Sequence, residues 1–228
     1  MKTAKFFEAI KKGHTEEVKR LLAEDPSLIH TNEGGLSPVL VAAYHRHPKL
    51  ADFLASKKVS LTVYEAAATG KTEHIIRILA HEPELVKQHA EDGFDPLGLA
   101  SFFGHYETSR YLIRAGAAVN SPSRNALQAT PLQSATAGNH IRIVDLLLAN
   151  GADPNCREQG GYTPLHAAAQ HGNLDMIRAL IFGGGDLDAR GNDGKLPVDV
   201  ALEANQQEAA KLLLEGITRR TRARRTGP

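Results

Sequence analysis

The feature that most constrains the fold of this chain is a sequence period of about 33 residues. Pairs of apolar residues recur, and the first members of successive pairs lie 33, 24, 34, 35, 33 and 33 residues apart. The pairs are Leu21-Leu22, Leu54-Ala55, Ile78-Leu79, Leu112-Ile113, Leu147-Leu148, Leu180-Ile181 and Leu213-Leu214. A second marker has the same period, because Leu or Val follows each of Pro96, Pro131, Pro164 and Pro197. Two independent markers with one period indicate a chain of seven structural repeats.

One repeat shows how this pattern produces local structure. Thr163 suits the N-cap of a helix, and Pro164 suits its first position, where a missing N–H costs nothing. Gly172 can adopt the left-handed conformation that ends this helix. Apolar residues then recur at 174, 177, 180 and 181, which is the spacing of one face of a second helix. Neither helix is long enough to be stable alone, so the stacking of repeats must provide the core.

These residues resemble the ankyrin repeat, whose signature is Thr-Pro-Leu-His, two alanines, Gly-His, an Ile-Val pair, Leu-Leu and Gly-Ala-Asp-x-Asn. The best matches are Thr163–Gly172 and Ala137–Asn155, followed by Gly104-His105 and Gly116–Asn120. The resemblance covers residues 4 to about 215, and segment 23–35 is similar to the opening repeats of bacterial ankyrin proteins. It implies an all-α fold, an ankyrin-repeat solenoid of stacked helix-turn-helix units with short loops or β-hairpin fingers.

The period predicts an ankyrin-repeat domain at 1–216 and a basic, flexible tail at 217–228. The repeats are expected at about 1–34, 35–61, 62–92, 93–127, 128–160, 161–194 and 195–216. The first repeat lacks Thr-Pro and carries lysines, and the last lacks a Gly-Ala-Asp segment, as expected of terminal caps. The 24-residue step shortens the loop at 56–62, and the 35-residue step lengthens the loop at 121–128.

Aromatic residues gather at positions that the resemblance places on a binding surface. In ankyrin stacks, the fingers and the C-terminal ends of the first helices line one concave face that commonly binds proteins. The chain has 7 Phe and 5 Tyr residues, and five of these aromatics fall at such positions: Tyr44, Phe94, Phe102, Phe103 and Tyr162. Aromatic anchors in interface cores contribute about 2 kcal/mol or more each. We therefore expect a protein partner on this face, with Arg124 and His171 also in the site.

The sequence alone also allows structural roles for these aromatic residues. Phe102 or Phe103 could instead fill a gap between repeats three and five, where the short loop disturbs the stack. Tyr44 and Tyr162 could be ordinary half-buried residues. The cluster as a whole favours an interface, since solvated positions normally carry polar residues.

Eleven histidines raise the question of metal binding or catalysis. The resemblance implies a structural hydrogen-bonding role for those at Gly-His positions and for His166 in Thr-Pro-Leu-His. His45 and His47 have no cysteine or carboxylate cluster in register, which argues against a zinc site. Cys156 has no positioned partner that would make it a nucleophile, and the run at 183–185 follows a helix, unlike a phosphate loop. We expect no enzymatic activity, no cofactor and no metal.

The C-terminal segment is strongly basic. Residues 217–228 include five arginines and no acid, and because the whole chain carries +1, the rest of it carries −4. The arginines are Arg219, Arg220, Arg222, Arg224 and Arg225. Three interpretations fit this segment: it is a solvated, disordered end; it binds nucleic acid, anionic lipid or an acidic partner electrostatically; or it folds back on the acidic body of the chain. The alternative function is therefore an adaptor to nucleic acid or an anionic surface.

Composition sets the remaining expectations. The near-neutral net charge gives no global attraction to nucleic acid or membrane, and the single cysteine fits a reducing compartment. No apolar run approaches the roughly 18 residues that a membrane span requires. We expect a cytoplasmic monomer without a membrane span that binds a protein of unknown identity.

Overall fold

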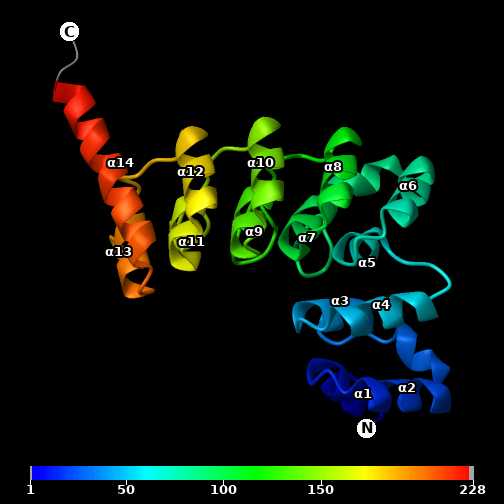
Figure 1. The fold of residues 1–228 in the computed structure, drawn as a ribbon. Coiled ribbons are helices and arrows are strands. Elements are labelled where there is room, and N and C mark those ends of the chain that lie inside the picture. The colour runs from blue at the N-terminus through cyan, green and yellow to red at the C-terminus, as the bar shows by residue number, and fades with distance from the viewer. Residues whose placement is uncertain (1, 226–228) are drawn as a thin grey trace. The chain divides into compact units, whose positions relative to one another are not determined.

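The computed structural model describes residues 2–225, with side chains described through residue 220. Within that range the chain is all-α, and fourteen α-helices form seven consecutive helix pairs (Figure 1). This arrangement confirms the predicted fold class. The chain divides into two compact units, Met1–Gly116 and Ala117–Pro228.

The N-terminal unit contains four helix pairs, and its eight α-helices have ten residues or fewer. Isolated helices of this length are marginal in water, so they depend on their neighbours. Accordingly, α1 packs on α3, α5 on α7 and α6 on α8. The elements are α1 (Lys2–Lys11), α2 (Thr15–Glu24), the 3-10 helix η1 (Pro26–His30), α3 (Pro38–Tyr44), α4 (Pro48–Lys57), α5 (Val63–Ala68), α6 (Thr72–His81), the 3-10 helix η2 (Pro83–Lys87), α7 (Pro96–Phe103) and α8 (Tyr106–Arg114).

The C-terminal unit contains three helix pairs in two layers. The first helices α9, α11 and α13 pack side by side, and the second helices α10, α12 and α14 form the other layer (Figure 1). Five of the six helices have nine residues or fewer, whereas α14 has 19. The elements are α9 (Pro131–Ala137), α10 (Ile141–Ala149), α11 (Pro164–His171), α12 (Leu174–Phe182), α13 (Pro197–Glu203) and α14 (Gln207–Arg225).

Helix starts follow the capping chemistry that the sequence predicts. Asp95 caps α7 by accepting the Gly98 N–H at 2.6 Å, and Thr130 caps α9 in the same way. Proline opens α3, α7, α9, α11 and α13. Helix α3 also starts at a proline, Pro38, so the proline marker extends to repeat two.

The core of each repeat comes from the apolar markers. Leu97, Leu132 and Leu165 follow the helix-start prolines and are each 0% exposed. The first member of each recurring pair is buried in six repeats, but in repeat three Leu79 is buried and Ile78 is only half-buried. The structural step into repeat three is therefore 25 residues and the next step 33, so a single step departs strongly from the period.

A buried ion pair closes the short connection between α4 and α5. Lys58 Nζ lies 2.6 Å from Glu65 Oε1, and these side chains are 11% and 1% exposed. The second carboxylate oxygen of Glu65 accepts the Thr62 N–H at 2.9 Å, while Thr62 Oγ1 accepts the Glu65 N–H at 3.1 Å. Both oxygens of the buried carboxylate are thus satisfied, as burial of a charge requires. This arrangement stands where other repeats have a longer finger loop.

Of the predicted short loops or β-hairpin fingers, the described residues form mainly loops and turns. Among the described residues, β pairing is limited to one isolated antiparallel bridge between Glu33 and Leu36. In the C-terminal unit, asparagines connect neighbouring fingers instead. Asn120 Nδ2 donates to Gly151 O at 2.9 Å, and Asn155 makes the equivalent contact one repeat later at 3.0 Å.

Helix α14 continues past the boundary predicted after Gly216. Its backbone is helical through 217–225, inside the segment that the sequence predicts to be a separate tail. A Cβ at Gly216 would lie 3.0 Å from Leu187 Cδ1, so glycine lets α14 pass close to the repeat-six finger. The flexible character of this segment in solution stays a prediction.

The Lys58–Glu65 pair gives a test of what the short connection contributes. Lys58→Met leaves the Glu65 carboxylate buried without its cation and is expected to lower the free energy of unfolding by about 3–5 kcal/mol. Adding Glu65→Gln is expected to recover most of this loss, because an amide keeps the capping acceptor and needs no cation. Urea denaturation measures both effects.

The matched control is Lys71→Met, which breaks an exposed pair with Asp52. Exposed ion pairs contribute little to stability, so its effect should be much smaller. Equal losses for Lys58→Met and Lys71→Met would show that the buried pair has no special role.

Candidate interaction surfaces

The predicted site residues divide between the two units. Those in the N-terminal unit are Tyr44, Phe94, Phe102 and Phe103, and those in the C-terminal unit are Arg124, Tyr162 and His171. Each unit therefore carries its own candidate surface.

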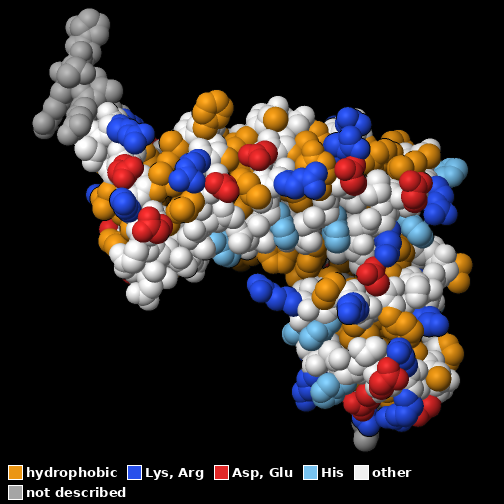
Figure 2. Space-filling model, in the orientation of Figure 1, with side chains coloured by type: hydrophobic (Ala, Val, Ile, Leu, Met, Phe, Trp, Pro, Cys, Tyr) orange, Lys and Arg blue, Asp and Glu red, His pale blue; other side chains and the backbone are white. Residues whose placement is uncertain are grey.

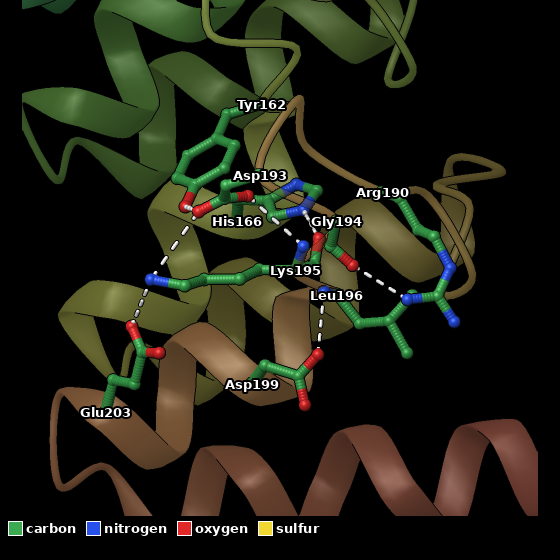
Figure 3. A network of polar contacts seen from close by, with 9 residues as sticks. All are labelled: Tyr162, His166, Arg190, Asp193, Gly194, Lys195, Leu196, Asp199 and Glu203. Carbon is green, nitrogen blue, oxygen red and sulfur yellow. Dashed lines mark hydrogen bonds and ion pairs between the residues drawn. The ribbon is translucent and has the colours of Figure 1, made fainter.

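The side chain of Tyr162 in the C-terminal unit is held in place by contacts within repeat six. Its ring stacks on the ring of His166 at 4.6 Å between centroids with an interplanar angle of 10°. Its hydroxyl donates to Asp193 Oδ2 at 2.8 Å (Figure 3). Gly191 lies directly against the ring, where any Cβ would collide with it. These contacts orient the ring and leave it half-buried.

His166, which is 0% exposed, links repeat six to repeat seven. Its Nδ1 accepts the Thr163 N–H at 3.1 Å and lies 2.9 Å from Thr163 Oγ1. With Nδ1 an acceptor, Nε2 carries the proton and donates to Lys195 O at 3.1 Å (Figure 3). The network therefore selects one neutral tautomer. Burial correspondingly lowers the pKa of His166 from its ordinary value of 6.5.

Gln133 makes the same connection one repeat earlier. Its Oε1 accepts the Thr130 N–H at 2.9 Å, and its Nε2 donates to Tyr162 O at 3.2 Å. The third residue of the first helix thus ties each of these repeats to the next, whether the side chain is an amide or a neutral imidazole.

A charged group borders the Tyr162 hydroxyl. Lys195 Nζ lies 2.8 Å from Glu203 Oε2 and 3.5 Å from Asp193 Oδ2 (Figure 3). The hydrogen bond to Glu203 raises the pKa of Lys195. Burial, followed by the hydrogen bond to Asp193, raises the pKa of Tyr162. The phenol therefore stays protonated and acts as a hydrogen-bond donor.

A groove of about 340 Å³ lies beside Tyr162. His171 lines it and is exposed, and its Nε2 lies 3.1 Å from Ala137 O of the preceding repeat. Arg124 is also exposed but does not line this groove. Two of the three predicted residues of this unit therefore share one groove.

In the N-terminal unit, Tyr44, Phe102 and Phe103 form one aromatic cluster. The Tyr44 ring centroid lies 6.4 Å from that of Phe102 and 5.3 Å from that of Phe103, and the two phenylalanines are 5.1 Å apart. Tyr44 ends α3 in repeat two, whereas the phenylalanines end α7 in repeat four. The cluster therefore joins repeats two and four, and each of the three rings is half-buried.

Asp92 fixes the polar end of this cluster. The Tyr44 hydroxyl donates to Asp92 Oδ2 at 2.7 Å, and the Phe94 N–H donates to Asp92 Oδ1 at 3.1 Å. Burial raises the pKa of Tyr44, with the Asp92 charge as a second cause. Phe94 is half-buried beside this turn.

Sequence reasoning missed the aspartates that position both tyrosines. Asp92 and Asp193 each precede a glycine, and each also accepts the backbone N–H two residues later. Asp-Gly is a strong turn signal, but it does not reveal which tyrosine will reach the other carboxylate oxygen.

In the described part of the basic tail, one arginine contacts repeat six. Arg220 Nη1 lies 2.7 Å from Asp186 Oδ1 and 3.5 Å from Asp188 Oδ2, so this arginine does contact the acidic body. Arg219 is 83% exposed. The side chains of Arg222, Arg224 and Arg225 lie outside the described residues. On the face shown in Figure 2, basic and acidic side chains alternate over α10 and α12.

The described residues include no group of three or more His, Cys, Asp or Glu side chains placed to hold a metal ion. Within the same part of the chain, no helix combines the length and apolar character needed to cross a bilayer. Cys156 Sγ lies 3.1 Å from Thr130 Oγ1, and burial raises the pKa of its thiol to about 11.

Models of ankyrin repeats match most of the chain. The family described as ankyrin repeats (3 copies) matches residues 63–158 and 132–222, and the family described as ankyrin repeats (many copies) matches residues 6–55. This chain belongs to the ankyrin-repeat family. Ankyrin repeats are generally protein–protein interaction modules and are typically non-catalytic, and these matches identify no catalytic domain.

Individual relatives share the repeats over part of their length. An ankyrin repeat protein of Rickettsia felis is 42% identical over 65 residues, which are 28% of this chain and 28% of the relative. The target of rapamycin complex 2 subunit AVO2 of Saccharomyces cerevisiae is 28% identical over 171 residues, covering 68% of this chain and 40% of the relative. The human ankyrin repeat and KH domain-containing protein 1 is 29% identical over 113 residues, covering 50% and 4%. The chain thus spans less than half the length of each.

The tautomer of His166 predicts a pH-dependent stability. The folded state holds the neutral ring, so unfolding takes up a proton below about pH 6.5 and the free energy of unfolding falls as pH decreases. His166→Gln is expected to remove this component, which is at most about 1.4 kcal/mol per pH unit for one proton. Urea denaturation from pH 7.5 to about 5 measures the slope.

Gln133→His is the complementary variant, because it places the same network one repeat earlier and should steepen the slope. A slope that is identical in the wild type, His166→Gln and Gln133→His would contradict the assignment of the tautomer.

The raised pKa of Cys156 predicts a protected thiol. At pH 8 only about one thiol in a thousand is ionised when the pKa is near 11, so an aromatic disulfide reagent should react slowly with the native chain. The same reaction in urea should be at least about tenfold faster, because unfolding restores an ordinary thiol pKa. Equal rates, followed by absorbance, would show that the thiol is accessible in the folded state.

Proposed function

We propose that this chain is a non-catalytic interaction module that binds a protein partner, with the aromatic cluster of its N-terminal unit as the main contact. The observation that carries this proposal is the meeting of Tyr44, Phe102 and Phe103 at the ends of two helices, with each ring half-buried. Such rings are already ordered by one another, so a partner that covers them gains apolar contact at a small further entropy cost.

The groove beside Tyr162 supports a second contact in the C-terminal unit. Its volume of about 340 Å³ accommodates a few side chains, and His171 and Glu158 offer polar groups at its border. In this proposal Tyr162 anchors the partner, and Arg124 supplies an exposed charge outside the groove.

The proposal is tested by alanine variants at Phe94, Phe103 and Tyr162. The tagged wild-type chain and each variant are used to capture proteins from a cell lysate, and the captured proteins are quantified by mass spectrometry. A specific partner should be recovered at least about tenfold less with Phe103→Ala, as expected for an anchor worth about 1.4 kcal/mol or more. Leu127→Ala, which removes another exposed apolar side chain, should leave capture unchanged.

Thermal melts separate binding from stability, because Phe103 also contacts Tyr44. Capture that is unchanged in all three aromatic variants would contradict the proposal. Capture that is lost only when residues 217–228 are removed, and that also disappears at high salt, would favour the alternative of an adaptor acting through the arginines.

A further inference from the structure

A groove of about 980 Å³ lies between α12, the finger of repeat six and α14. Its apolar lining includes Ile181, Leu187 and Leu212. The groove exists because α12 ends at Phe182 and the chain turns, whereas α14 remains helical at the corresponding point 33 residues later. An uninterrupted α14 therefore stands beside the finger and leaves a long recess, which none of the aromatic residues proposed above lines.

Phe182 stands at the border of this recess and is 96% exposed. The residues one repeat before and after it are Ala149 and Glu215, so this position in the fold does not require an aromatic side chain. An exposed phenyl ring gains nothing from the protein core, and an exposed apolar side chain beside an apolar recess is typical of a binding surface. Phe182 is thus suited to pack against an apolar side chain of a partner.

The charges around the recess favour carboxylates. Its lining contains four arginines but only two acidic residues, Asp186 and Glu215. Arg220 is paired with Asp186 and Asp188, and Arg178 is paired with Asp175. The charges of these two arginines are therefore already compensated within the chain.

Arg157 and Arg219 remain able to bind an anion. Arg157 is exposed, and its Nη1 donates to two backbone carbonyls, those of Gly161 and Arg190, so these bonds do not neutralise its charge. Arg219 is 83% exposed and has only a long contact of 3.8 Å with Glu215. An exposed pair of this kind contributes little, so a carboxylate of a ligand can replace it.

We propose that this groove binds an acidic segment of a partner protein that carries an apolar anchor residue. The anchor packs on Phe182 and over Ile181 and Leu212, while carboxylates of the segment pair with Arg157 and Arg219. Phosphates of a nucleic acid would also use the arginines, and a base could stack on Phe182, but the aliphatic lining of Ile181, Leu187 and Leu212 favours an apolar side chain. None of the aromatic residues of the function proposed above lines this groove, although Thr163 lines both it and the groove beside Tyr162.

Fluorescence anisotropy with a labelled synthetic peptide tests the proposal on the full chain. The probe alternates Glu with Leu and Phe; one comparison peptide replaces Glu with Lys, and another replaces Leu and Phe with Ser. The acidic apolar probe should bind saturably, and Phe182→Ala should weaken it by at least about tenfold, as for an interface anchor. Arg219→Glu should also weaken it, and the Lys and Ser peptides should bind far less.

Val59→Ala is the matched control, because Val59 is 101% exposed and lies in the N-terminal unit. This variant should bind the probe like the wild type. Circular dichroism verifies that each variant is folded, which is expected because the Phe182 and Arg219 side chains are almost fully exposed.

Three outcomes would overturn the proposal: no saturable binding of the acidic apolar probe, equal affinity of wild type and Phe182→Ala, or equal affinity for the Ser peptide. Displacement of the probe by a single-stranded oligonucleotide with the same affinity for wild type and Phe182→Ala would indicate general polyanion binding instead. Failure of the Phe103→Ala and Tyr162→Ala tests would leave these results unaffected, so the two proposals fail separately.

Discussion

The structure depends on hydrogen bonds between neighbouring repeats. Helices of six to ten residues cannot persist alone, so each repeat needs its neighbours both for its core and for its polar groups. In the C-terminal unit, the side chains of Gln133 and His166 each bond polar groups both in their own repeat and in the following one. Each caps its own helix with one polar atom and reaches a carbonyl of the following repeat with another.

In repeat three, where the 33-residue period is broken, the third residue of the first helix has a different chemistry. In repeat three Glu65 caps its helix but has no proton to donate to the next repeat, and instead it binds Lys58 from the shortened connection. A buried carboxylate with its cation thus stands where repeats five and six carry a neutral donor. The same repeat separates α3 from α7, whose end residues Tyr44, Phe102 and Phe103 nevertheless meet.

The proposed binding surfaces lie at local departures from the regular repeat. Tyr44 and Tyr162 sit at different positions of their repeats, but each donates to the aspartate of an Asp-Gly turn and is held half-buried. At the C-terminal end, α14 does not turn where α12 does. The consequence is a recess with an apolar lining, bordered by the exposed Phe182, for which we propose that Arg157 and Arg219 bind carboxylates.

The sequence by itself determined the all-α repeat fold, the cap residues and most of the core, because these depend on spacing and on residue type within one repeat. It also selected Tyr44, Phe102, Phe103 and Tyr162 as candidate contacts. Only the tertiary structure decided that the first three form one cluster, that α14 continues through Gly216, and that Phe182 borders a recess. These features depend on contacts between residues about 30 or more positions apart, where a change of one residue in a loop alters which side chains meet.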